Sequence, residues 1–198
     1  MFLNRWFTNH TAYFLIFCLL ILWPALSVLA NSQVERVPQA VSLTIQPATQ
    51  TVKNIGDTFS IEIAASALEN LGSFEFSIDY DPALIQFQQA SLNESFLNGT
   101  GRSFSAVGPD NNSDTGTVAY GAFSLGNSPD GPNGNGTLAT LTFSALAQGS
   151  GTLNFIEAGV TNIAGNAQEI SQMTGGQIRI GEKGGSTQSN LYLPVTIR

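Results

Sequence analysis

The sequence is poor in the side chains that most often carry enzyme chemistry. It has one Cys, one His and two Trp among 198 residues, and Trp6, His10, Cys18 and Trp23 all fall within the first thirty. Residues 31–198 therefore contain no thiol and no imidazole. This excludes Ser-His and Cys-His nucleophiles, zinc or iron sites bound through those groups, and disulfide bonds within that part of the chain.

Positive charge is also scarce. Seven Lys and Arg residues face 14 Asp and Glu, which gives a net charge of −7, and the cations do not cluster. A nucleic-acid partner requires clustered cations to meet its phosphates. The charge pattern therefore predicts that this protein has no nucleic-acid partner.

The N-terminal segment has the pattern of an export signal. Arg5 precedes an apolar run over residues 12–23, Pro24 interrupts it, and the sequence Ser-Val-Leu-Ala ends at Ala30. A positive start, an apolar stretch and a small-residue cleavage site are typical of secretory signals. We predict a signal peptide over residues 1–30, with an uncleaved membrane anchor as the alternative, and a secreted, extracellular or cell-surface location. The membrane is expected to be contacted only through this segment.

The rest of the chain is predicted to contain one folded domain. Residues 31–40 form a polar leader, residues 41–181 a domain, and residues 182–198 a flexible linker with a short C-terminal tail. Within the domain, short segments alternate between apolar and polar residues and are separated by Gly, Asn, Asp, Ser and Pro, which predicts an all-β sandwich or jelly roll. We expect nine strands, at residues 41–45, 59–63, 74–80, 85–92, 103–107, 117–125, 137–147, 151–159 and 176–180. Residues 81–84 are expected to form a single helical turn.

Two segments rich in turn-forming residues, 108–116 and 126–136, are predicted to be exposed connections outside the sheets. The first places Asp110, Asn112 and Asp114 at positions 1, 3 and 5 of an EF-hand-like spacing. Its glycine comes one residue late, however, and Gly121 stands where a bidentate Glu is required. We therefore predict a polar turn and no metal or other cofactor, with calcium binding by these three residues as the alternative.

Carboxylates are the remaining candidates for catalysis, because a glycosidase needs only two Asp or Glu residues facing a cleft. Asp79 and Asp81 lie close together, but they stand at the end of a predicted strand and are followed at once by Pro82. This position is typical of a solvated strand terminus. The sequence predicts that the protein is not an enzyme.

Five motifs occur in the order found in one family. They are GDTF at 56–59, FEFSIDYDP at 74–82 followed by Leu84, GTLATLTF at 136–143, FIEAG at 155–159 and GGQIRI at 175–180. In this order the domain resembles the cohesin modules of cellulosome scaffoldins. The resemblance implies a nine-stranded jelly-roll sandwich, related in fold to a class of cellulose-binding modules. It also implies that one sheet face binds dockerin modules and so assembles polysaccharide-degrading enzymes.

The resemblance points to outward residues on the strand at 74–80. Ser73 and Glu75 occupy the family's outward polar and carboxylate positions, and Ser77 follows on the same side by alternation. Gly108 stands where many dockerin-binding members have an aromatic residue. Together with two aromatic residues further along the chain, the candidate partner-binding residues are Ser73, Glu75, Ser77, Tyr120 and Phe123.

Three functions are consistent with these features. The first is an exported, non-catalytic binding module for a dockerin-like or other extracellular partner in polysaccharide-degrading or cell-surface assemblies. The second is direct binding of a polysaccharide, for which Tyr120, Phe123, Phe96 and Phe104 are the available platform residues. The third is a structural surface-layer or adhesin subunit.

Overall fold

The computed structural model describes residues 40–181. The predicted signal peptide, the leader except for its last residue, and the linker and tail at 182–198 lie outside the described residues. No helix between residues 40 and 181 is long and apolar enough to cross a bilayer.

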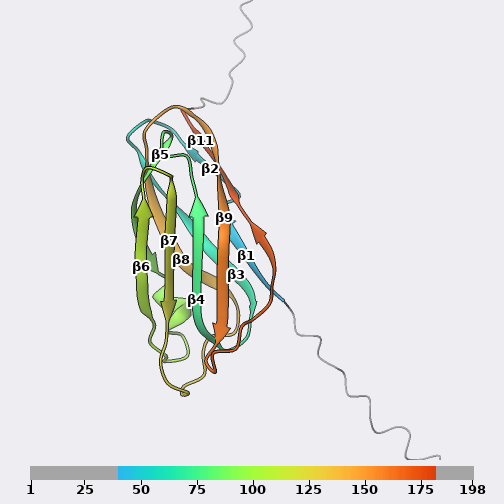
Figure 1. Cartoon of the computed structure of the whole chain (residues 1–198). Coiled ribbons are helices and arrows are strands. Elements are labelled where there is room, and N and C mark those ends of the chain that lie inside the picture. Colours follow the sequence, from blue (N-terminus) through green and yellow to red (C-terminus); the bar gives the residue numbers. More distant parts are fainter. Residues whose placement is uncertain (1–39, 182–198) are drawn as a thin grey trace, which may run out of the picture. The chain divides into compact units, whose positions relative to one another are not determined.

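The described chain folds into two β-sheets packed face to face (Figure 1). The first sheet has the strand order β10-β1-β3-β8-β5 and the second β2-β11-β9-β4-β7-β6. Neighbouring strands are antiparallel except β1 with β10 and β2 with β11, which are parallel. The strands are β1 Val41–Gln46, β2 Thr49–Val52, β3 Thr58–Leu68, β4 Leu71–Asp79, β5 Ile85–Leu92, β6 Ser105–Asn112, β7 Thr117–Phe123, β8 Gly134–Ala145, β9 Gly149–Asn162, β10 Ile170–Thr174 and β11 Gly176–Ile180.

Alternation along the strands places the apolar residues between the sheets. In β3, for example, Phe59, Ile61 and Ile63 are buried while Ser60 and Glu62 are exposed. Because successive side chains of a strand point to opposite faces, each strand adds every second residue to the core. The all-β sandwich predicted from the sequence is confirmed.

Aromatic rings join the two layers. Phe143 of β8 lies 5.8 Å from Phe59 and 5.7 Å from Phe87 within the first sheet, measured between ring centroids. The ring of Phe143 also contacts the ring of Tyr80 edge-on, with centroids 5.3 Å apart, and Tyr80 directly follows β4 of the second sheet. Phe143 is fully buried and connects the layers at this end of the sandwich.

The prediction of nine strands was two short. Each of the nine corresponds to a strand, but β2 and β10 had not been predicted. Both are edge strands that pair with a single neighbour, and β2 buries only Val52, whereas β10 buries no side chain fully. With so little burial, they carry no period-two pattern from which a strand could be predicted.

The prediction that residues 108–116 form a connection outside the sheets was wrong for its first half. Residues 108–112 belong to β6, which pairs with β7 although all eight of its residues are exposed. The pairing shifts register between Val107 and Asp110, so a bulge accommodates the Gly-Pro pair. Residues 134–136 likewise open β8.

The helical turn predicted at residues 81–84 is present. The N–H of Ile85 donates to the Asp81 carbonyl at 3.0 Å, and the Asp81 side chain accepts from the N–H of Ala83. A short helix that was not predicted, α2 (Glu94–Leu97), begins after Asn93, whose side chain caps it by accepting from the N–H of Phe96.

We predict that Phe143→Ala lowers the free energy of unfolding by about 3–5 kcal/mol, because it removes a fully buried ring and leaves a cavity between the sheets. Urea denaturation of the purified full chain measures the change. Phe123→Ala is the matched control and should cost less than about 1 kcal/mol, since that ring is partly exposed at the surface. Equal losses from the two substitutions would contradict the role assigned to Phe143.

Candidate functional site

The outer face of strands β9, β4, β7 and β6 carries most of the residues singled out from the sequence. In β4, Phe74, Phe76 and Ile78 are buried, so the side chains that alternate with them point outward. These outward residues are Ser73, Glu75 and Ser77, as predicted. The four strands lie side by side in the second sheet (Figure 1).

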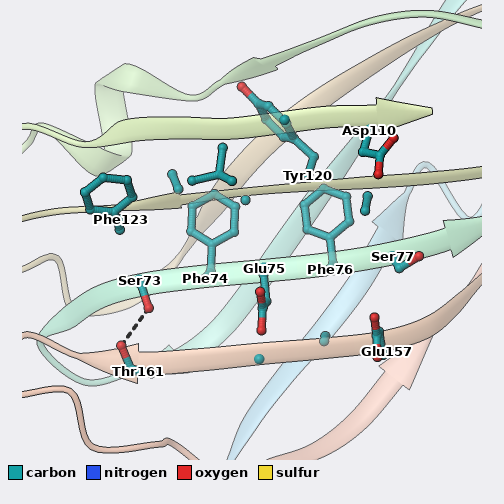
Figure 2. A pocket seen from close by; sticks show the side chains of 17 residues that line it. Ser73, Phe74, Glu75, Phe76, Ser77, Asp110, Tyr120, Phe123, Glu157 and Thr161 are labelled. Atoms are coloured by element: carbon teal, nitrogen blue, oxygen red, sulfur yellow. Dashed lines mark hydrogen bonds between the residues drawn. The ribbon is translucent and has the colours of Figure 1, made fainter.

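Glu75 stands at the centre of this face without side chains beside it. Its partner on β7 is Gly121 and its partner on β9 is Gly159. One step along, Ser77 pairs with Ala119 and Glu157, and at the other end Ser73 pairs with Phe123 and Thr161. We call the resulting depression the Glu75 hollow; it has a volume of about 410 Å³ (Figure 2).

Glycine occupies these two positions for different physical reasons. A Cβ at Gly121 would stand 2.6 Å from the Phe74 carbonyl oxygen and 3.1 Å from the Cα of Glu75, so β7 can approach β4 this closely only without a side chain there. A Cβ at Gly159 would lie 3.2 Å from Oε1 of Glu75. Because this is the far end of a flexible side chain, Gly159 provides space for the carboxylate and is not required by the backbone.

The Glu75 hollow is acidic with an apolar rim. Glu75, Glu157 and Asp110 line it, and none of its lining residues is Lys or Arg. Val107 and Phe123, 55% and 38% exposed, are the large apolar side chains that stand exposed along it. The Oγ of Ser73 and the Oγ1 of Thr161 are 2.7 Å apart and fix one corner (Figure 2).

Tyr120 does not share this face. It is 5% exposed and packs edge-on against Phe76, with ring centroids 6.3 Å apart. In β7 the outward positions are Ala119, Gly121 and Phe123, so Tyr120 points into the core. In this position Tyr120 offers a partner no exposed ring, so its burial does not support the partner-binding role predicted for it. The small residues on either side of it gave no apolar contrast from which the buried face of β7 could be recognised.

The aromatic platform expected for direct sugar binding does not form. Tyr120 is buried, Phe96 lies over Gly136 of β8, and Phe104 is half-buried against the core. Of the four candidates, only Phe123 presents an exposed ring. Coplanar stacking along a polysaccharide needs several such rings, so these four cannot supply it.

The residues considered for calcium binding and for catalysis do not come together in one site. Asn112 Oδ1 accepts from the N–H groups of Asp114 and Thr115, at 3.0 and 3.2 Å, as in a polar turn. Asp110 instead lines the Glu75 hollow. Residues 40–181 contain no group of three or more His, Cys, Asp or Glu side chains placed to hold a metal ion. Asp79 accepts from the N–H of Asn154 on β9, whereas Asp81 accepts from the N–H of Ala83 within its own turn.

Sequence reasoning missed several residues of the face. The sequence assigns no role to Glu157, Val107, Gly121 or Gly159. It points to Asp110 only as a calcium ligand. Glu157 lies beside a register shift in the pairing of β4 with β9, between Ser77 and Ile78. Its direction therefore does not follow from simple alternation. The glycines are significant only because β7 and β9 flank Glu75.

A buried cation supports the loop next to this face. Arg102 is 2% exposed, and its Nε donates to Ser124 Oγ at 2.6 Å. Its two terminal nitrogens donate to the carbonyls of Pro129 and Gly126. Ser124 in turn donates to the Gly72 carbonyl at 2.9 Å. One guanidinium thus ties the loop after β7 to the start of β4.

Comparisons with known proteins agree with this architecture. The family model described as Cohesin domain matches residues 43–180. No curated protein is significantly similar to the sequence. Solved structures are similar in fold, at 15% identity or less for the three given next.

A type I cohesin from a cohesin–dockerin complex of Clostridium thermocellum has a TM-score of 0.58 and 13% identity, covering 72% of this chain and 99% of that one. The sixth cohesin of scaffoldin B from Acetivibrio cellulolyticus, in complex with a Cel5 dockerin, has a TM-score of 0.54 and 15% identity, with coverage of 72% and 99%. A non-cellulosomal cohesin from the archaeon Archaeoglobus fulgidus gives 0.54 and 15%, with coverage of 72% and 91%.

We predict that Arg102→Met lowers the free energy of unfolding by about 2–4 kcal/mol, because it leaves buried carbonyl oxygens without donors. Lys53→Met is the control, since Lys53 is exposed, and it should change stability by less than about 0.5 kcal/mol. Urea denaturation gives both values. Hydrogen exchange at residues 124–131 should accelerate in the Arg102 variant alone; unchanged exchange there would show that Arg102 does not hold the loop.

Burial raises the pKa of Tyr80 and of Tyr120 above that of a free phenol, although the hydrogen bond from Tyr80 to Asn111 opposes the shift at Tyr80. The unfolded chain therefore loses these protons at lower pH than the folded chain. The contribution of these two tyrosines to stability should be constant up to about pH 9 and fall as the pH rises through and beyond about 10. Urea midpoints across this range measure the fall, which Tyr120→Phe should reduce. The same alkaline slope in that variant would contradict the assignment.

Proposed function

Because the chain belongs to the cohesin family, we propose that it is a non-catalytic protein-binding module whose Glu75 hollow receives a dockerin-like partner. The observation that carries the proposal is the position of Glu75, which lies between two glycines at the centre of an exposed sheet face. Solved relatives from Clostridium thermocellum and Acetivibrio cellulolyticus are complexes of cohesins with dockerins, which supports a partner of that kind.

The shape of the face favours a partner with a protruding side chain. Ala119, Gly121 and Gly159 leave the hollow open above Glu75, while Phe123 and Thr161 border it at one end. A long side chain projecting from a partner element can enter this space and reach the carboxylate. A flat partner would leave Glu75 buried and without a counter-charge, which is costly.

The charge of the face specifies the chemistry of that side chain. Three carboxylates, on Glu75, Glu157 and Asp110, line the hollow without a cation among them. A Lys or Arg of the partner would pair with Glu75 and remain close to the other two. The same acidic field attracts a basic partner before contact, so the association rate should fall as the ionic strength rises.

Apolar contact supplies the rest of the interface. Val107 and Phe123 are exposed beside the acidic centre and give a partner helix a place for one or two aliphatic side chains. Aromatic anchors commonly contribute a large part of the binding energy of an interface. We propose that Phe123 is such an anchor and that Ser73 and Ser77 contribute polar contacts at the rim.

The sequence supports a proposed location and biological setting. The predicted export signal at residues 1–30 supports binding outside the cell or at its surface, in a polysaccharide-degrading or cell-surface assembly. The residues that line the hollow include no His or Cys and no Ser hydroxyl hydrogen-bonded to a base. This supports a role in assembly and not in catalysis.

The test measures binding of the immobilised full chain to dockerin modules encoded by the same genome, by biolayer interferometry. We expect at least one dockerin to bind, and Glu75→Lys to weaken that binding by at least about tenfold, or about 1.4 kcal/mol, because it places like charges together. Phe123→Ala should weaken it to a similar degree.

Glu62→Lys is the matched control. Glu62 is an exposed carboxylate on the outer face of the other sheet, so this substitution changes the net charge by the same amount and should leave binding unchanged. Failure of every dockerin to bind would refute the proposed partner. Equal effects of the Glu75 and Glu62 substitutions would refute the proposed face.

A further inference from the structure

The outer face of the opposite sheet has a different chemistry from the Glu75 hollow. In strands β1, β3 and β8, the residues that alternate with the core are almost all hydroxyl or amide side chains, and Glu62 is the one charged residue among them. These outward residues are Ser42, Thr44, Gln46, Thr58, Ser60, Glu62, Ala64, Ser66, Thr137, Thr140, Thr142 and Ser144.

A second depression, which we call the Ala64 hollow, lies within this face. Ala64 pairs with Thr44 on β1 and with Thr137 on β8, so a methyl group stands between two longer side chains. The hollow has a volume of about 340 Å³, and its other lining residues include Ser42, Ser66 and Asn135. This volume falls at the lower end of the range of about 300–1,000 Å³ typical of small-ligand sites.

Existing hydrogen bonds set how the lining groups can act. Thr137 donates to Glu62 Oε2 at 3.0 Å, which leaves its own oxygen as an acceptor. Asn135 Oδ1 accepts from the N–H of Ala67 at 3.0 Å, which leaves the amide N–H groups of Asn135 as donors. Ser42 and Ser66 share one hydrogen bond, 2.6 Å between their oxygens, so one of their two protons remains to be donated. The hollow therefore offers both donors and acceptors.

This composition limits the class of ligand. No Lys or Arg lines the Ala64 hollow, so phosphate, sulfate and polyanionic chains find no counter-charge. Its only apolar lining atoms belong to small residues and to the stems of polar ones, which is unlike a protein-interface anchor site. Vicinal hydroxyl groups, each both a donor and an acceptor, match this mixture of donors and acceptors.

We propose that the Ala64 hollow binds one or two units of a neutral polysaccharide. This site is separate from the Glu75 hollow because the two lie on the outer faces of opposite sheets. One molecule can then hold a protein partner on one face and a glycan on the other. The hollow differs from the aromatic platform considered from the sequence, since it recognises sugar hydroxyls by hydrogen bonds and involves no ring stacking.

Affinity electrophoresis of the full chain tests the proposal, in native gels that contain xylan, galactomannan or hydroxyethylcellulose, with polygalacturonate as the charged comparison. We expect at least one neutral polysaccharide to retard the protein. Ala64→Leu fills the hollow and should reduce the apparent affinity at least tenfold. Thr44→Val removes one hydroxyl at constant volume and should reduce it at least threefold.

Two controls make the result specific. Thr140→Val removes a hydroxyl from the same face outside the hollow and should migrate like the unmodified protein. Glu75→Lys changes the charge of the protein, so its mobility is first measured in a gel without polysaccharide. Relative to that gel, polysaccharide should retard it as much as the unmodified protein. Failure of the dockerin proposal is then distinguishable from failure of this one. If Ala64→Leu does not fold, as shown by circular dichroism, the isosteric Thr44→Val still decides.

Three results would overturn the proposal. They are unchanged mobility in every neutral polysaccharide, retardation by polygalacturonate alone, and equal loss of retardation in the Thr44 and Thr140 variants.

Discussion

Phe143 packs against Tyr80 across the space between the two sheets, and an apolar layer extends from this contact through the sandwich. Residues 40–181 contain no cysteine, so the sheets are held by this layer and by the strand ladders without a covalent link. Every inward position is therefore needed for packing density, which leaves little tolerance for change. Binding chemistry is confined to the outward positions and to the loops.

The outward positions are not equivalent on the two faces. The six-stranded sheet has carboxylates, exposed apolar side chains and glycines around Glu75, whereas the five-stranded sheet has hydroxyls and amides around Ala64. Glycines on the two neighbouring strands leave the space beside Glu75, whereas Ala64 is itself the small residue between the longer side chains of Thr44 and Thr137. Small side chains at outward positions thus give two hollows with different ligand chemistry.

Strands with a buried side and an exposed side were predictable, since burial imposes period two on the sequence. The outward directions of Ser73, Glu75 and Ser77 followed directly from Phe74, Phe76 and Ile78. Strands β2, β10 and most of β6 were not predictable, because edge strands are stabilised by backbone pairing to one neighbour and bury little. Backbone pairing alone imposes no alternation of apolar and polar residues on a segment such as 108–112.

The sequence by itself determined the all-β class, the absence of thiol and imidazole chemistry from residues 31–198, and the resemblance to cohesins. Only the tertiary structure placed Gly121 and Gly159 on either side of Glu75, turned Tyr120 into the core, and buried Arg102 beneath the loop after β7. These features depend on which strands become neighbours and in which register. Strand pairing joins residues far apart in the chain, and alternation within a single strand shows which residues face the core but does not identify the neighbouring strands.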